Sequence, residues 1–163
     1  MPFIGIYTGN KQFRLIKAKI IDCINLKEEN IIRISNQNIE NLKNVKFETI
    51  VISKPLEDIE KNEYLEKIIK NVKYLILNGD VDLKLFINSK EKINLITYGM
   101  SQKSTITMSS INDESILISL QREIMNIYDK CVSMKEINIE LKEYRHIKME
   151  DILLIYAVYF IYK

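Results

Sequence analysis

Apolar residues in the first hundred positions form short continuous runs separated by amphipathic segments. Continuous apolar runs suit strands that are covered on both faces. We therefore predict five buried strands, FIGIYTG, NIIRIS, FETIVIS, KYLILNGD and KINLITYG, at residues 3–9, 30–35, 47–53, 73–80 and 92–99. Apolar residues at helical spacing predict helices over 13–26 and 56–72, and we also expect helical segments over 36–45 and 82–89. Strands that alternate with helices predict a mostly parallel sheet with helices on both faces.

The pattern changes after Gly99. The segments STITMSSI, SILISLQ and EINIEL, which begin at Ser104, Ser115 and Glu136, alternate apolar and polar residues. This period of two is typical of antiparallel strands with one solvated face. The run MEDILLIYAVYFIY over 149–162 predicts a last helix, and its apolar part is about half the length needed to span a bilayer. We therefore expect one domain over residues 1–163, a three-layer α/β fold with a small antiparallel extension near its C-terminal end.

Composition and charge exclude several function classes. The 163 residues are 47% hydrophobic and 28% charged, with a net charge of +2, which is ordinary for a globular chain. Lysine and glutamate are interspersed, so we expect no nucleic-acid partner. With a single histidine and no closely spaced cysteine pair, we expect no zinc site, and Cys23 and Cys131 are interpreted as reduced structural thiols. The start of the chain has no leader pattern, so we expect a cytoplasmic protein without a membrane partner.

Six short stretches carry a resemblance to a known family. They are YTGNKQF at 7–13, IIRIS at 31–35, TIVISKPLED at 49–58, LILNGDVD at 75–82, LITYGM at 95–100 and INIELKEYRHIKMEDILLIYAVYF at 137–160. In this order they resemble the central, ATP-binding domain of the Mur ligases, which add amino acids to peptidoglycan precursors. The resemblance implies a P-loop-NTPase-like fold. It also implies chemistry in which ATP and Mg²⁺ activate a carboxylate for attack by an amine.

The same stretches depart from the family where its chemistry resides. The loop before Lys11 is about two residues short of a phosphate-binding loop, and Gln12 stands where a Mg²⁺-binding hydroxyl is needed. Arg33, Ile59 and Glu150 replace the family's metal-binding Glu, its metal-binding His and its adenine-contacting Asn. We therefore expect no catalytic residue, no metal ligand and no cofactor.

Two sets of polar residues each allow two interpretations. The residues Thr8, Gly9, Asn10 and Lys11 form either a residual phosphate site or a plain strand-to-helix turn in which Gly9 supplies backbone freedom. The pair Asn78 and Asp80 either faces a ligand at the carboxyl edge of the sheet or forms a tight turn.

Other residues near the family motifs favour structural roles. Glu57 and Asp58 are interpreted as first-turn acids of a helix. His146, which fits the family's His, is interpreted as a surface residue at a helix start.

Two functions follow from these observations. The first is a non-catalytic, pseudoenzyme-like protein that binds a protein partner or a second copy of itself, with the link to cell-wall metabolism that the resemblance implies. The tyrosine-rich segment IYAVYFIYK at 155–163 is either its docking face or part of the core. The second is a nucleotide or phosphate binder, a weak ATPase or a subunit of a split ligase, which uses ATP and Mg²⁺ at the loop Thr8–Lys11.

Overall fold

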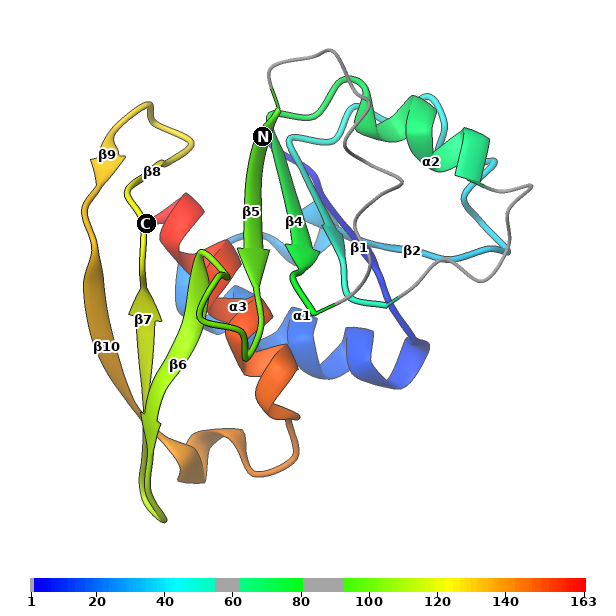
Figure 1. The fold of residues 1–163 in the computed structure, drawn as a ribbon. Coiled ribbons are helices and arrows are strands. Elements are labelled where there is room, and N and C mark those ends of the chain that lie inside the picture. Colours follow the sequence, from blue (N-terminus) through cyan, green and yellow to red (C-terminus); the bar gives the residue numbers. More distant parts are fainter. Residues whose placement is uncertain (1, 55–61, 81–92) are drawn as a thin grey trace.

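A computed structural model describes residues 2–54, 62–80 and 93–163 (Figure 1). The helices are α1 (Asn10–Ile24), α2 (Asn62–Ile69) and α3 (Met149–Tyr162), with the short 3-10 helices η1 (Glu28–Asn30) and η2 (Leu141–Tyr144). The strands are β1 (Ile4–Tyr7), β2 (Ile31–Ile34), β3 (Thr49–Ile52), β4 (Tyr74–Asn78), β5 (Asn94–Tyr98), β6 (Ile106–Ile111), β7 (Ser115–Leu120), β8 (Ile124–Met125), β9 (Cys131–Val132) and β10 (Lys135–Glu140).

Eight of these strands form one mixed sheet, in the order β10-β7-β6-β5-β4-β3-β1-β2. The strands from β2 to β5 are parallel, and β6 joins β5 in the same direction through the pair Tyr98 and Ile106. Strands β7 and β10 are antiparallel to their neighbours, and β8 pairs with β9 in a separate hairpin. The predicted fold class, a mostly parallel α/β sheet with an antiparallel extension, is confirmed.

Helices cover both faces of the parallel strands. On one face α1 and α3 lie side by side and pack against the first of two apolar clusters, which continues under β5, β6 and β7 (Figure 1). On the other face, residues of α2 join the second cluster, with Leu75 and Leu77 of β4. Strands β1, β3 and β4 are buried at every position, which explains why they read as continuous apolar runs.

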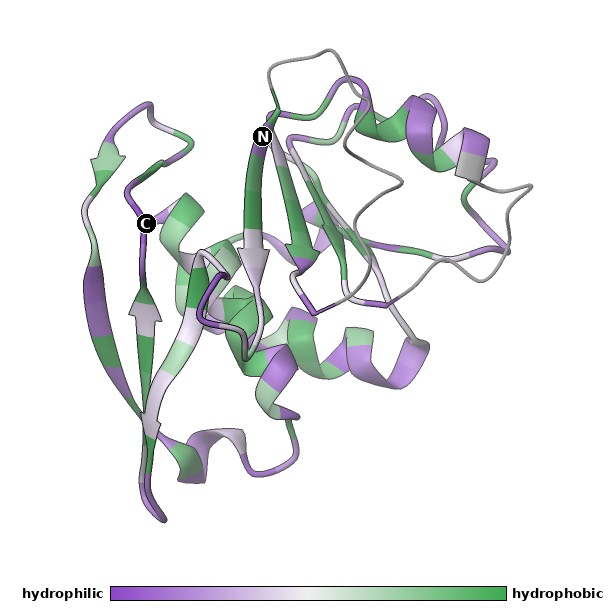
Figure 2. Cartoon of the chain, in the orientation of Figure 1, coloured by the Kyte–Doolittle hydropathy of each residue, from purple (hydrophilic) through white to green (hydrophobic). Residues whose placement is uncertain are grey.

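The last helix is part of the core. Beyond its first turn, helix α3 is mostly green in Figure 2, and Tyr156, Phe160 and Tyr162 are all buried. A helix that is apolar on every side is buried on every side. Of the two interpretations of the tyrosine-rich segment, the structure supports the core and leaves little of this helix for docking.

The antiparallel extension shows the predicted alternation. Ile116, Ile118 and Leu120 of β7 are at most 1% exposed and face α3, whereas Ser115, Leu117 and Ser119 lie on the other face and are partly exposed. The predicted strand over 136–141 appears as β10 and continues into η2.

Two local predictions differ from the structure. The segment 36–45, predicted as helical, is a series of turns. There Asn38 accepts a hydrogen bond from the Ser35 amide (2.8 Å) and donates one to the Arg33 carbonyl (2.8 Å). Asparagine side chains that bond the backbone compete with helix formation. The β8–β9 hairpin was not predicted, because its two-residue strands are too short to show a period. The predicted helix 82–89 and the start of the predicted helix 56–72 lie outside the described residues.

Candidate functional site

The candidate phosphate loop is a two-residue connection. Strand β1 ends at Tyr7 and α1 begins at Asn10, so only Thr8 and Gly9 join them. Gly9 has φ −67° and ψ 154°, an extended conformation open to any residue, and a Cβ atom there would meet Gln12 Oε1 at 3.4 Å, an ordinary contact. The expectation that Gly9 supplies special backbone freedom is therefore wrong.

Gln12 links the start of α1 to the start of α3. The Thr8 hydroxyl, which is buried, donates to Gln12 Oε1 over 3.5 Å. The Gln12 side chain also hydrogen-bonds the Asp151 carboxylate. Burial raises the pKa of Asp151, while the Lys148 charge and the Gln12 hydrogen bond act in the opposite direction. The side chain that follows Lys11 is thus engaged within the protein, whereas Asn10 and Lys11 are exposed.

Asp151 is a polar core residue that the sequence analysis did not single out. It is only 6% exposed and lies in the first turn of α3. An acid in the first turn is ordinary at a helix start, where it favours the positive end of the helix dipole. The surrounding sequence could have indicated that Asp151 is buried. The run MEDILLI forms a helix with no polar face on which the carboxylate could reach solvent.

Asn78 and Asp80 hold the loops after β4 and β5 together. The Asp80 amide donates to Asn78 Oδ1 (2.9 Å), and the Met100 amide donates to Asp80 Oδ2 (3.0 Å). Gly99 has φ +155°, and a Cβ atom there would stand 2.6 Å from Asp80 Oδ2. The Asp80 carboxylate therefore occupies the space that the missing Gly99 side chain leaves, and both polar residues have a structural role in this turn.

The structure brings the two predicted groups to one edge of the sheet but not into one cluster. Both follow the carboxyl ends of parallel strands, where ligands bind in open α/β sheets. Strand β3 lies between β1 and β4, which separates Thr8 from Asn78 by two strand spacings, about 10 Å.

The end of β2 is occupied by internal hydrogen bonds. Ser35 Oγ donates to Asn38 Oδ1 (3.2 Å), and the Tyr7 hydroxyl donates to Asn36 Oδ1 (2.9 Å). Arg33 is half-buried in β2, opposite Ile6 of β1. A guanidinium there opposes the binding of a cation at this strand end.

Where the structure describes them, the remaining family positions give no ligand set. Glu57, Asp58 and Ile59 lie outside the described residues. His146 and Glu150 are exposed, while Tyr144 is buried with its hydroxyl 3.2 Å from that of Tyr156. Within residues 2–54, 62–80 and 93–163 no three His, Cys, Asp or Glu side chains lie where they could hold a metal ion.

The two cysteines differ in environment. Cys23 on α1 is half-buried against the core, and burial raises the pKa of its thiol. Cys131 lies exposed on the β8–β9 hairpin. The expected structural role therefore suits Cys23 but not Cys131. In the part of the chain that the structure describes, no helix is both long and apolar enough to cross a membrane.

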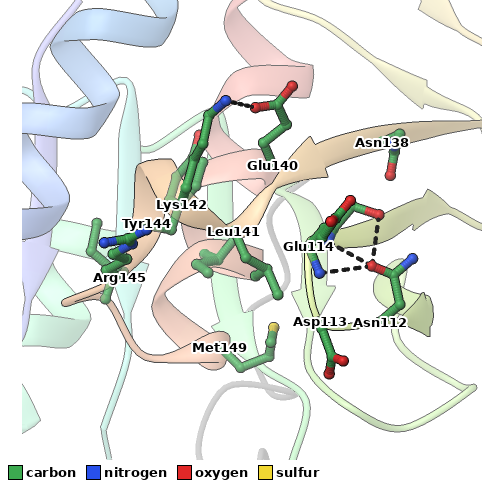
Figure 3. A pocket seen from close by; sticks show the side chains of 13 residues that line it. Asn112, Asp113, Glu114, Asn138, Glu140, Leu141, Lys142, Tyr144, Arg145 and Met149 are labelled. Atoms are coloured by element: carbon green, nitrogen blue, oxygen red, sulfur yellow. Dashed lines mark hydrogen bonds and ion pairs between the residues drawn. The ribbon is translucent and has the colours of Figure 1, made fainter.

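A hollow of about 820 Å³ opens between the β6–β7 turn, the end of β10 and the start of α3 (Figure 3). Asn112 accepts hydrogen bonds from the amides of Glu114 (2.9 Å) and Ser115 (2.8 Å) on one side, and Lys142 pairs with Glu140 at 2.5 Å on another. Its lining carries acids, bases and apolar side chains together, so it favours no single ligand class. The sequence analysis missed it because its residues lie far apart along the chain.

Comparison with known proteins identifies the architecture. No protein-family model and no curated protein sequence matches the chain. Among solved structures, the UDP-N-acetylmuramate–alanine ligase MurC from Thermotoga maritima aligns with 98% of the chain, with a TM-score of 0.54 and 13% sequence identity. The chain has a Mur-ligase-like fold. It covers 40% of the length of that ligase, and at this identity the likeness concerns the fold alone.

Proposed function

We propose that this chain is a non-catalytic, Mur-ligase-like protein that acts by binding another protein molecule. The two-residue connection between β1 and α1 supports this most. A phosphate cradle needs several successive backbone amides that turn inward around the anion. Thr8 and Gly9 form the whole connection here, and the Thr8 side chain is buried, so no loop remains to surround a phosphate group.

The side chains around this connection support the same proposal. Gln12 stands where a Mg²⁺-binding hydroxyl is needed, and its amide is engaged with Thr8 and Asp151. At β4 the Asp80 carboxylate accepts from the Met100 amide. Gln12 and Asp80 are thus committed to internal contacts, whereas Asn10 and Lys11 remain exposed. A role connected with cell-wall metabolism rests on the fold alone and is part of the proposal.

Nucleotide or phosphate binding, as in a weak ATPase or a split-ligase subunit, is the second candidate. It rests on the first turn of α1, which contains no acidic residue and no side-chain cap. The backbone amides of this turn and the exposed Lys11 present positive charge at the edge of the sheet, and the neutral Asn10 is exposed beside them. ATP and Mg²⁺ would be the ligands of this candidate.

Thermal unfolding in the presence of ATP, ADP and GTP, each with and without Mg²⁺, separates the two candidates. A ligand that binds only the folded state increases the free energy of unfolding by mass action, by about 2.7 kcal/mol at a hundredfold excess over Kd. The midpoint of thermal unfolding therefore rises. We expect no rise at millimolar nucleotide.

Lys11→Ala is the informative variant and Lys70→Ala is the matched control, because Lys70 is an exposed lysine that follows α2. A rise in the midpoint that Lys11→Ala abolishes and Lys70→Ala preserves would contradict the proposed function and favour the second candidate.

A further inference from the structure

Strand β10 leaves one edge of the sheet open. It is six residues long and stands at the end of the strand order, and among the described strands it pairs with β7 alone. Figure 1 shows its full length along the outside of the sheet. An edge of this length exposes backbone donors and acceptors that can pair with another strand.

The two faces of β10 differ in chemistry. Ile137 and Ile139 lie on the face toward α3, as does Lys135, whose Nζ stands 5.4 Å from the centre of the Phe160 ring. Glu136 and Asn138 alternate with them and are exposed on the opposite face. Charged side chains on an edge strand discourage indiscriminate pairing, so any partner strand must suit these charges.

The sequence of β10 suits its own copy in one antiparallel register. A two-fold axis that relates two copies of a strand in one sheet pairs a residue with itself. If Ile137 faces itself, Glu136 lies opposite Asn138 of the partner subunit, and a carboxylate can accept a hydrogen bond from that amide. If Asn138 faces itself, Glu136 lies opposite Glu140 of the partner subunit, which is repulsive and occurs twice. Of the two registers that keep five residues of β10 paired, the one centred on Ile137 is therefore favoured.

The surfaces beyond the two ends of β10 carry complementary charge. A groove of about 370 Å³ beside the start of β10 has lysines as its charged lining residues, Lys130, Lys135 and Lys163. Beside the end of β10 lies the β6–β7 turn with Asp113 and Glu114, held there by the Leu141 amide, which donates to the Glu114 carbonyl (2.8 Å). The hollow at that end is also lined by Glu140, which pairs with Lys142, and by Arg145, so its acids exceed its bases by one. Antiparallel pairing places the lysine groove of one copy toward this end of the other, twice by symmetry.

We propose that a second copy of this chain binds along β10, so that two sheets join into one continuous sheet about a two-fold axis at Ile137. This inference rests on the proposed function, because it names the protein partner and the surface that receives it. The contact is a single strand pair with its flanking charges, smaller than a standard interface of about 1,600 Å². We therefore expect reversible association rather than a permanent dimer.

Sedimentation velocity from low micromolar to near-millimolar protein tests this proposal. We expect the weight-average mass to rise from monomer toward dimer. Asn138→Glu places a second carboxylate opposite Glu136 of the partner subunit and weakens association about tenfold or more, because the repulsion occurs twice. Adding Glu136→Lys to Asn138→Glu creates opposite-charge pairs and restores association.

Ser110→Glu is the matched control. Ser110 is exposed on the central strand β6, on the face that carries Asn138, so this change adds the same charge away from the edge. It leaves association unchanged, and circular dichroism confirms that every variant is folded.

A monomer at all concentrations overturns the proposal and leaves the proposed function standing, with β10 open to a strand of another protein. A dimer that Asn138→Glu leaves intact also overturns it, since the contact must then lie elsewhere. A nucleotide-induced rise in the unfolding midpoint that depends on Lys11 would instead contradict the proposed function while the dimer persists.

Discussion

The hydrogen bond between Thr49 and Tyr162 gives a quantitative test of how α3 docks on the sheet. Thr49 begins β3 and is fully buried, and its Oγ1 lies 2.8 Å from the hydroxyl oxygen of Tyr162, which is 6% exposed in the last turn of α3. The two residues are 113 positions apart, so only the tertiary structure brings them together. Thr49→Val and Tyr162→Phe each remove one hydroxyl and nearly preserve the shape of the side chain.

The expected magnitudes follow from burial. Each single change leaves one buried hydroxyl without a partner, which costs about 1–3 kcal/mol of the free energy of unfolding. The double variant removes both hydroxyls and loses only the net contribution of the hydrogen bond, about 0.5–1.5 kcal/mol. The coupling energy of the double-mutant cycle should therefore be about 1 kcal/mol or more. For a chain of this size, 1 kcal/mol corresponds to about 2–4 °C in Tm.

Urea unfolding followed by far-UV circular dichroism and by tyrosine fluorescence measures the cycle, since the chain has no tryptophan. The control cycle combines Thr49→Val with Tyr144→Phe, which breaks the separate Tyr144–Tyr156 contact and should be additive within about 0.5 kcal/mol. If the Thr49 and Tyr162 changes are also additive, the two hydroxyls are not paired and the described docking of α3 is wrong.

Two further predictions concern the glycines that follow β1 and β5 and the buried Asp151 of α3. Gly99→Ala should destabilise the fold by about 1–3 kcal/mol, because Gly99 has a φ of +155° and the Asp80 carboxylate lies beside it. Gly9→Ser should be neutral or stabilising by up to about 1 kcal/mol, because extended backbone at a helix N-cap suits serine. Equal losses of stability for the two variants in urea unfolding would contradict this. Because burial raises the pKa of Asp151, the stability that its protonated form contributes is present below its ordinary value of 3.8 and is lost as the pH rises through the folded-state value. Asp151→Asn should remove this loss, so the unfolding midpoint of the variant relative to the parent should increase as the pH rises from 3.8 toward neutrality; a constant difference would refute it.

The sequence by itself determined most of the elements and the fold class. The apolar runs at β1, β3 and β4 are buried on both faces, and this burial is what makes them continuous. The run over 149–162 is predicted and found with the same bounds, since a long apolar segment that begins with acids has few alternatives to a buried helix. The Mur-ligase resemblance, carried by short stretches in order, agrees with the fold that the structure shows.

Only the tertiary structure shows which contacts the polar residues make. The sequence left Lys11 and Asp80 open between ligand contacts and turn contacts, because a motif does not reveal which neighbours the fold places beside it. The Asp80 carboxylate fills the space at Gly99, and Gln12 connects Thr8 to Asp151. Each of these contacts depends on the crossing of separate elements. The periodicity of apolar residues along the chain indicates which positions are buried. The partner of a buried polar group depends instead on strand order and on how the helices dock, and neither is encoded in a local stretch of sequence.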